Sequence, residues 1–179
     1  MGIGSVVRKG WPVVVELAQT LPGPPELVWD LITDWEHQDD WMIEASDFVV
    51  TSPQREGVGV EAEATITIGG ISTRDRVRVI AWEPGRHVAI EHLGWVSGEG
   101  HLYLTPLSDE RTHLFWREQL YPPAGILGSL GMSAFKPTMT KVFRRDLKVL
   151  AGLVRARTSA SISTTQKRGS VARSSRPRR

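Results

Sequence analysis

The sequence predicts an α+β protein in which one curved antiparallel sheet of six to seven strands packs on a single long C-terminal helix. The apparent order is a strand, two short helices, a run of strands and a long helix. No strand–helix–strand alternation interrupts that run, which favours antiparallel pairing. At 179 residues the chain suffices for one well-filled domain. We therefore expect a flexible leader over residues 1–10, a domain over residues 11–157, and a disordered tail over residues 158–179.

The first elements are a strand and a helix pair. Residues 12–21 are rich in β-branched side chains, which is typical of a strand. Pro24 and Pro25 then suit the start of a helix, and Glu26 suits its positive end. Apolar side chains recur at helical spacing at Val28, Leu31, Ile32 and Trp35. The polar and acidic stretch over residues 36–40 and the return to apolar Trp41 indicate a kink and a second short helix. A short strand over residues 48–51 follows.

A hairpin is predicted around Gly69-Gly70, a dipeptide typical of two-residue turns. If Ile68 pairs with Ile71, Glu63 and Glu61 lie opposite Arg76 and Arg78, and such opposite charges support the register. The same register points Asp75 inward, opposite Ala64. Its inward neighbours on that strand are Thr73, Val77, Val79 and Ala81.

Three further strands complete the predicted sheet. A tight turn at residues 83–86 points Val88, Ile90 and His92 inward. The next strand, over residues 95–107, carries Gly98 and Gly100 beside Leu102 and Leu104, and these glycines either leave room for a ligand or mark a bulge. On the last strand the more apolar face comprises Leu114, Trp116, Glu118 and Leu120. The alternative inner face comprises His113, Phe115, Arg117, Gln119 and Tyr121.

A long helical region is predicted over residues 124–157, broken near Pro137 because an internal proline removes a hydrogen bond. Beyond the proline one stripe is apolar: Met139, Phe143, Leu147, Leu150 and Val154. The other side is basic: Lys141, Arg144, Arg145, Lys148, Arg155 and Arg157.

Composition excludes several classes of site. The chain has no cysteine, and its five histidines include no i, i+4 pair, so we predict no metal site. Neither glycine-rich stretch continues into a phosphate-loop or dinucleotide motif, so no cofactor is predicted. No apolar run approaches the roughly 20 residues of a transmembrane helix, and the expected location is the cytoplasm. Residues 158–179 hold six basic residues and no acid, which leaves residues 1–157 with a net charge of −4.

Several stretches resemble one superfamily. The run PPELVWDLITDWE followed by DDWM is similar to the opening of the helix-grip, START-like proteins (SRPBCC), which include the pollen allergen Bet v 1 and lipid-transfer domains. The stretches WEPGRHV, GEGHLYLTPL and THLFWREQLYPP before a long helix resemble the polyketide cyclase/dehydrase branch. The resemblance covers roughly residues 12–157. It implies a helix-grip fold with a deep cavity, suited to an apolar or aromatic ligand, between the sheet and the long helix.

The candidate site follows from the predicted inner faces. Asp75, His92 and Glu118 are the candidate catalytic residues, because a carboxylate and an imidazole in an apolar cavity have useful pKa values for acid–base work. Cavity hydrogen bonding without catalysis is the alternative role for them. The predicted ligand-binding set is Trp41, Thr73, Asp75, Val77, Ile90, His92, Leu102, Trp116, Glu118, Met139 and Phe143.

Three functions remain open. The first is a carrier or sensor that binds a hydrophobic small molecule, lipid-like or polyketide-like. The second is a cyclase or dehydratase that uses the interior acid–base residues. The third is an interaction protein whose basic tail contacts nucleic acid or a membrane. Ligand binding leads, because the implied fold supplies a cavity while no residue set establishes catalysis.

Overall fold

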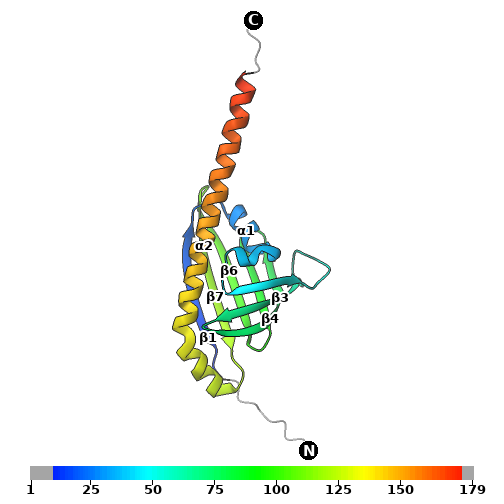
Figure 1. The fold of residues 1–179 in the computed structure, drawn as a ribbon, viewed down its shortest axis with the longest axis vertical. Helices are drawn as coiled ribbons and strands as arrows, with labels where there is room; N and C mark the ends of the chain where they lie inside the picture. Colours follow the sequence, from blue (N-terminus) through cyan, green and yellow to red (C-terminus); the bar gives the residue numbers. More distant parts are fainter. Residues whose placement is uncertain (1–9, 175–179) are drawn as a thin grey trace, which may run out of the picture.

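The computed structural model describes the backbone of residues 10–174 and the side chains of residues 10–160, and it confirms the predicted fold class (Figure 1). Strand β1 (Val13–Leu21) leads into helix α1 (Pro25–Thr33) and the 3₁₀ helix η1 (Trp35–Asp40). Six strands follow: β2 (Ala45–Val50), β3 (Glu61–Ile68), β4 (Ile71–Glu83), β5 (His87–Leu93), β6 (Ser97–Ser108) and β7 (Arg111–Tyr121). Helix α2 (Gly125–Ser174) ends the described chain. The predicted leader lies almost wholly outside the described residues.

All seven strands form one antiparallel sheet in the order β1-β7-β6-β5-β4-β3-β2. From β2 to β7 each strand pairs with the next one in the chain, and β1 pairs with β7, so that β1 and β2 form the two edges of the sheet. The sheet curves beside α2, and α1 and η1 lie at one end of it (Figure 1). The topology therefore leaves one concave face, which the long helix covers.

The β3–β4 hairpin has the predicted register. Ile68 pairs with Ile71, and Ala64 pairs with Asp75. Glu61 forms an ion pair with Arg78 directly opposite, with 2.7 Å between Oε1 and Nη2. The carboxylate of Glu63 instead reaches diagonally to Arg74. Two-residue periodicity and cross-strand charge thus predict which residues of these strands face inward.

One facing on β4 is corrected. A bulge between Val79 and Ala81 shifts the register with β5, so strict alternation fails beyond that point. Trp82, rather than Ala81, then turns to the helix side. Its ring packs edge-on against Trp29 at a centroid distance of 4.9 Å and also lies near Trp35. Through these contacts Trp82 packs α1 and η1 against the end of the sheet.

The β7 facing agrees with the first of the two alternatives: Leu114, Trp116 and Glu118 are buried. They meet a core formed by β1, α1 and the apolar stripe of α2. The stripe is buried along its length at Met139, Phe143, Leu147, Leu150 and Val154.

Helix α2 differs from its prediction in two ways. It continues through Pro137 instead of breaking there. Phe135 before the proline and Met139 after it both pack on the core, which holds the helix together across the missing hydrogen bond, and its first turns run at an angle to the rest (Figure 1). The helix also continues through Ser174, so residues 158–174 are helical rather than disordered. Thr158 continues the helix with a hydroxyl bond to the carbonyl of Val154. Residues 175–179 lie outside the described residues.

Within residues 10–174 no helix combines the length and apolarity needed to cross a bilayer.

Candidate functional site

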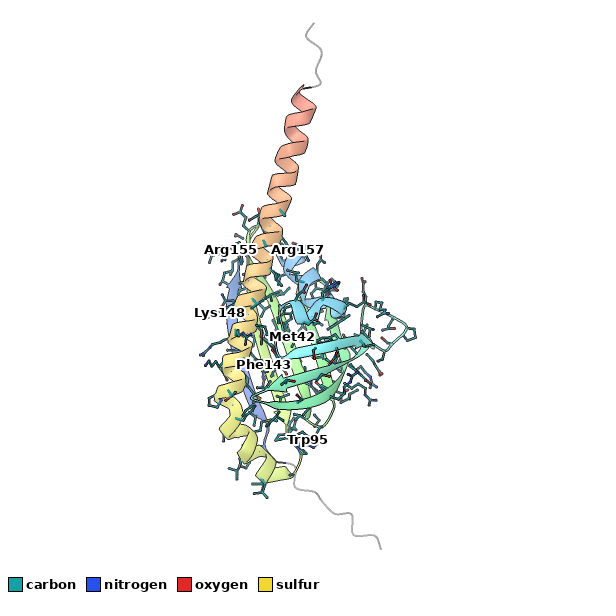
Figure 2. The ribbon with its side chains drawn as sticks, in the orientation of Figure 1. Met42, Trp95, Phe143, Lys148, Arg155 and Arg157 are labelled. Carbon is teal, nitrogen blue, oxygen red and sulfur yellow. The ribbon has the colours of Figure 1, made fainter. Side chains whose placement is uncertain are left out.

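A cavity of about 640 Å³ lies between α2 and the inner face of the sheet. This size falls within the roughly 300–1,000 Å³ usual for small-molecule sites. Its wall is mostly apolar and aromatic. The residues that line it are Met42, Glu44, Ile66, Ile68, Ile71, Thr73, Arg74, Asp75, His92, Trp95, Val96, Trp116, Glu118, Leu120, Pro122, Pro123, Ala124, Leu127, Gly128, Gly131, Met132, Phe135, Met139 and Phe143. Among those labelled in Figure 2, Met42 and Phe143 lie between sheet and helix, and Trp95 lies near the start of α2.

The cavity reaches the surface between the start of α2 and the turns that join β3 to β4 and β5 to β6. Leu127 and Trp95 line it and yet are 77% and 67% exposed. Ile71, at the β3–β4 turn, is also both lining and exposed. These three side chains mark the mouth of the cavity. Trp116 and Phe143 form a deeper wall, where their rings stack at a centroid distance of 4.7 Å.

Three charged side chains meet in the polar part of the wall. His92 Nδ1 lies 2.7 Å from Asp75 Oδ2, and His92 Nε2 lies 3.1 Å from Glu118 Oε2. The other oxygen of Glu118 accepts a hydrogen bond from Trp116 Nε1 at 2.7 Å. All four side chains come from inner faces of β4, β5 and β7. The sequence-predicted polar residues are therefore brought together.

A glycine permits the bond between His92 and Glu118. Strand β6 lies between β5 and β7, and Gly100 on β6 pairs with Glu118. A Cβ atom at Gly100 would lie only 2.5 Å from Glu118 Oε1. Because Gly100 has no side chain, the carboxylate lies over β6 and reaches His92. The glycines were predicted either to leave room for a ligand or to mark a bulge. Gly100 instead leaves room for the side chain of Glu118.

The imidazole of His92 is held as a cation. Burial opposes its charge, but the hydrogen bonds and negative charges of Asp75 and Glu118 outweigh that cost and raise the pKa of His92 to about 10. The cluster of Asp75, His92 and Glu118, written below as the carboxylate–imidazolium cluster, then carries a net charge of −1. Its two ring N–H groups are both occupied. An imidazolium with so high a pKa is a poor acid or base near neutral pH.

A second acidic pair, Glu44 and Asp146, went unpredicted. Glu44 lines the cavity, and Asp146 on α2 is fully buried. Burial, together with the neighbouring Asp146 carboxylate, raises the pKa of Glu44 to about 8. One oxygen of each carboxyl, Oε2 of Glu44 and Oδ2 of Asp146, is buried without a hydrogen-bond partner, and burial of this kind favours the neutral form of a carboxyl group. Asp146 also accepts the backbone N–H of Ile43 at 3.3 Å, which ties α2 to the segment after η1.

Four predicted ligand-binding residues lie off the cavity wall. Trp41 is buried behind Trp116, with its ring edge-on at 5.9 Å. Ile90 and Leu102 are partly buried and pack against the hydrophobic core rather than lining the cavity. Val77 pairs with His92 but does not line the cavity. Thr73, Asp75, His92, Trp116, Glu118, Met139 and Phe143 do line it.

Sequence reasoning missed most of the mouth. Leu127, Met132 and Phe135 precede Pro137 and so lie outside the predicted apolar stripe. For Asp146 a signal existed, since an acid three residues after Phe143 and four before Leu150 falls on the buried side of the helix. Over residues 10–160 no group of three or more acids and histidines is arranged to hold a metal ion. In the carboxylate–imidazolium cluster the two carboxylates bind opposite nitrogens of the ring, so the three side chains do not point towards one common metal position.

A model of one protein family, described as "Polyketide cyclase / dehydrase and lipid transport", matches residues 12–155. No curated protein sequence matches the chain. Among solved structures, the Zhui aromatase/cyclase from Streptomyces sp. R1128 is similar with a TM-score of 0.70 and 20% identity, covering 82% of this chain and 96% of that one.

Two further structures share the fold. A START superfamily protein from Mycobacterium smegmatis has a TM-score of 0.68 and 16% identity, covering 80% of this chain and 97% of its own. The di-domain ARO/CYC StfQ from the steffimycin biosynthetic pathway has a TM-score of 0.68 and 14% identity, covering 83% of this chain and 53% of its own. At these identities the likeness concerns the fold alone.

Proposed function

Since the chain belongs to the polyketide cyclase / dehydrase and lipid transport family, we propose that it binds a hydrophobic or aromatic small molecule as a carrier or sensor. The observation that carries this proposal is the cavity of about 640 Å³ with its mostly apolar wall. The binding unit is residues 11–157, as the sequence predicts. Its ligand is lipid-like or polyketide-like in size and polarity.

The polar part of the wall narrows the ligand class. His92 donates its two ring N–H groups to Asp75 and Glu118, and Trp116 donates its indole N–H to Glu118. None of these three donors is left for a ligand. The carboxylate oxygens keep spare acceptor capacity, and the carboxylate–imidazolium cluster is net negative. The wall is therefore suited to a neutral ligand that donates a hydrogen bond, such as an alcohol or phenol. It is unsuited to a carboxylate, because Arg74, the other cation that lines the cavity, is ion-paired with Glu63.

Native mass spectrometry of protein purified from its host tests the proposal directly. A co-purifying small molecule of suitable mass supports it. Titration with naphthalene, 2-naphthol and 2-naphthoate, monitored by tryptophan fluorescence, tests separately whether the cavity binds an apolar ring and whether its wall selects a hydrogen-bond donor. Trp116 lies in the wall and reports occupancy.

We expect naphthalene to bind and 2-naphthol to bind more tightly than 2-naphthoate by tenfold or more, because a hydrogen bond to a charged group contributes about 1.5–3 kcal/mol. Failure of all three probes would argue against an open binding cavity. Binding of naphthalene with equal affinities for naphthol and naphthoate would contradict only the polar part of the argument.

A cyclase or dehydratase is the second candidate function, and one observation favours it. Glu44 lines the cavity and its pKa of about 8 lets it hold or release a proton near neutral pH. The carboxylate–imidazolium cluster is less suited to that work. If the protein is an enzyme of this kind, Glu44→Gln abolishes turnover while the fold is kept. If it is a carrier, Asp75→Asn and His92→Ala shift ligand affinity by about 1–3 kcal/mol.

A further inference from the structure

Charge is divided sharply along the chain. Residues 1–124 hold nine basic and 19 acidic residues, a net charge of −10 without histidines, whereas residues 125–179 hold 13 basic residues and one acid, a net charge of +12. The single acid is Asp146, which is fully buried. The described part of α2 after its first turns therefore presents positive charge to solvent, while the strands and short helices carry the negative charge.

The exposed side of α2 changes character along its length. At its start, Ile126, Leu127 and Leu130 are 45%, 77% and 53% exposed, although they are large and apolar. After Pro137 the exposed positions at three- and four-residue spacing are basic, and we call them the basic stripe: Lys141, Arg144, Arg145, Lys148 and Arg155. The apolar and basic groups follow one another along one side of the helix. Lys148 and Arg155 can be followed up α2 in Figure 2.

The apolar end of this surface coincides with the cavity mouth. Leu127 and Trp95 both line the cavity at its mouth and are largely exposed. Trp11, itself 46% exposed, is attached to the same part of α2 through a hydrogen bond from its indole to Ser133. A cluster of exposed large apolar side chains at the entrance to an apolar cavity is the sort of patch that marks an interaction site.

We propose that the outer side of α2 docks on an anionic lipid bilayer, with Ile126, Leu127, Leu130 and Trp95 entering the interface and the basic stripe contacting the headgroups. A helix side that combines large apolar residues with lysine and arginine matches such an interface. Charge complementarity orients the protein, because the acidic sheet side is repelled by the same surface. Docking would place the cavity mouth against the lipid.

Two other occupants suit the surface less well. Nucleic acid would use the basic stripe but leave Ile126, Leu127 and Leu130 without a partner, and no aromatic side chain is interleaved among the basic ones for base stacking. A second copy would offer its acidic sheet side to the stripe and would again leave the apolar end uncovered. Only a surface that is both anionic and apolar satisfies both parts.

Vesicle co-sedimentation tests the proposal. The full chain is mixed with vesicles of phosphatidylcholine alone or of phosphatidylcholine with phosphatidylserine. We expect binding to the mixed vesicles, little binding to phosphatidylcholine, and weakening as salt is raised. The triple variant Lys141→Gln, Arg144→Gln, Lys148→Gln should lose about fivefold in affinity per charge removed. A matched triple variant away from α2, Arg76→Gln, Arg86→Gln, Arg111→Gln, should bind as the wild type does.

The apolar part is tested with the double variant Ile126→Ser, Leu130→Ser, whose positions do not line the cavity. We expect weaker binding to mixed vesicles. Naphthalene affinity in the absence of lipid should be unchanged in this variant and in both triple variants, so a failure of the cavity proposal is seen separately. The docking proposal is overturned if both triple variants lose binding equally, if the chain binds duplex DNA but no vesicle, or if it only self-associates.

Discussion

Nδ1 of His92 lies 2.7 Å from Oδ2 of Asp75, so a cation and a carboxylate join strands β5 and β4 at the cavity wall. Glu118 binds the other ring nitrogen from β7. Because both nitrogens donate, the ring forms both hydrogen bonds only when it is protonated. The cluster therefore links three strands of the sheet through one charged ring.

This arrangement predicts a loss of stability at high pH. The pKa of His92 is about 10 in the folded protein and near 6.5 when the chain is unfolded. Its contribution is fully present below pH 6.5 and is lost as the pH rises through 10. We expect the free energy of unfolding to fall by up to about 1.4 kcal/mol per pH unit in that window. Urea unfolding at several pH values measures it.

The variant His92→Gln serves as the reference for that measurement. It should be less stable than the wild type at pH 7, because the buried Glu118 and the half-buried Asp75 lose their cation. The difference between the two proteins should shrink towards pH 10. A constant difference across the range would show that His92 does not titrate as described.

The position of this cluster was open to prediction because it rests on local rules. Alternation along a strand and a two-residue turn place Asp75 inward, and the tight turn at residues 83–86 carries this facing on to His92. The facing of Glu118 was predicted from the more apolar of the two faces of its strand. The counting failed at Trp82, because the bulge between Val79 and Ala81 reverses the facing of the residues that follow it on β4. Nothing in the sequence near residue 80 marks that bulge.

The Glu44–Asp146 pair illustrates the other limit. Its two members are about a hundred residues apart in the chain, and they meet only because α2 crosses the segment after η1. The apolar stripe of α2 was predicted, and an acid on it was visible, but its partner depends on tertiary packing. Trp41 was misplaced for the same reason, since Trp116 stands between it and the cavity.

Replacing Gly100 by alanine should disturb the cluster. The new Cβ would lie 2.5 Å from Glu118 Oε1, so the carboxylate must move away from His92. We expect a loss of about 1–3 kcal/mol of stability and a lower pKa for His92, because one of its hydrogen bonds is weakened. Chemical denaturation and NMR titration of the ring measure the two effects.

Gly152→Ala is the matched control, since nothing lies within 4 Å of a Cβ atom there and the residue is in a helix. It should gain up to about 1 kcal/mol from helix propensity. Equal effects of the two substitutions would mean that Gly100 is not needed for the approach of Glu118.

Glu44→Gln should remove a second pH dependence of the stability, which arises from a buried carboxyl group that is neutral when protonated. Burial raises the pKa of Glu44 from 4.5 to about 8, so its contribution is present below pH 4.5 and is lost as the pH rises through 8. Glutamine stays neutral at every pH. We expect the variant to gain stability relative to the wild type between pH 5 and pH 9, by about 1.4 kcal/mol for each unit of displaced pKa at most. Glu56→Gln, at an exposed position, is the matched control for the change of residue type.

Gly131 offers a direct test of the cavity mouth. It lines the cavity near Leu127, and nothing lies within 4 Å of a Cβ atom placed there. Gly131→Phe therefore starts from a position with room for a Cβ and adds an aromatic ring at the entrance, and the helix tolerates it because phenylalanine has a better helix propensity than glycine. We expect the melting temperature to change little and the affinity for 2-naphthol to fall several-fold.

Gly152→Phe places the same ring on an exposed part of α2 outside the cavity wall and should leave naphthol binding unchanged. If both variants bind the probe as tightly as the wild type does, the ligand enters elsewhere and the mouth assigned to Leu127 and Trp95 is wrong.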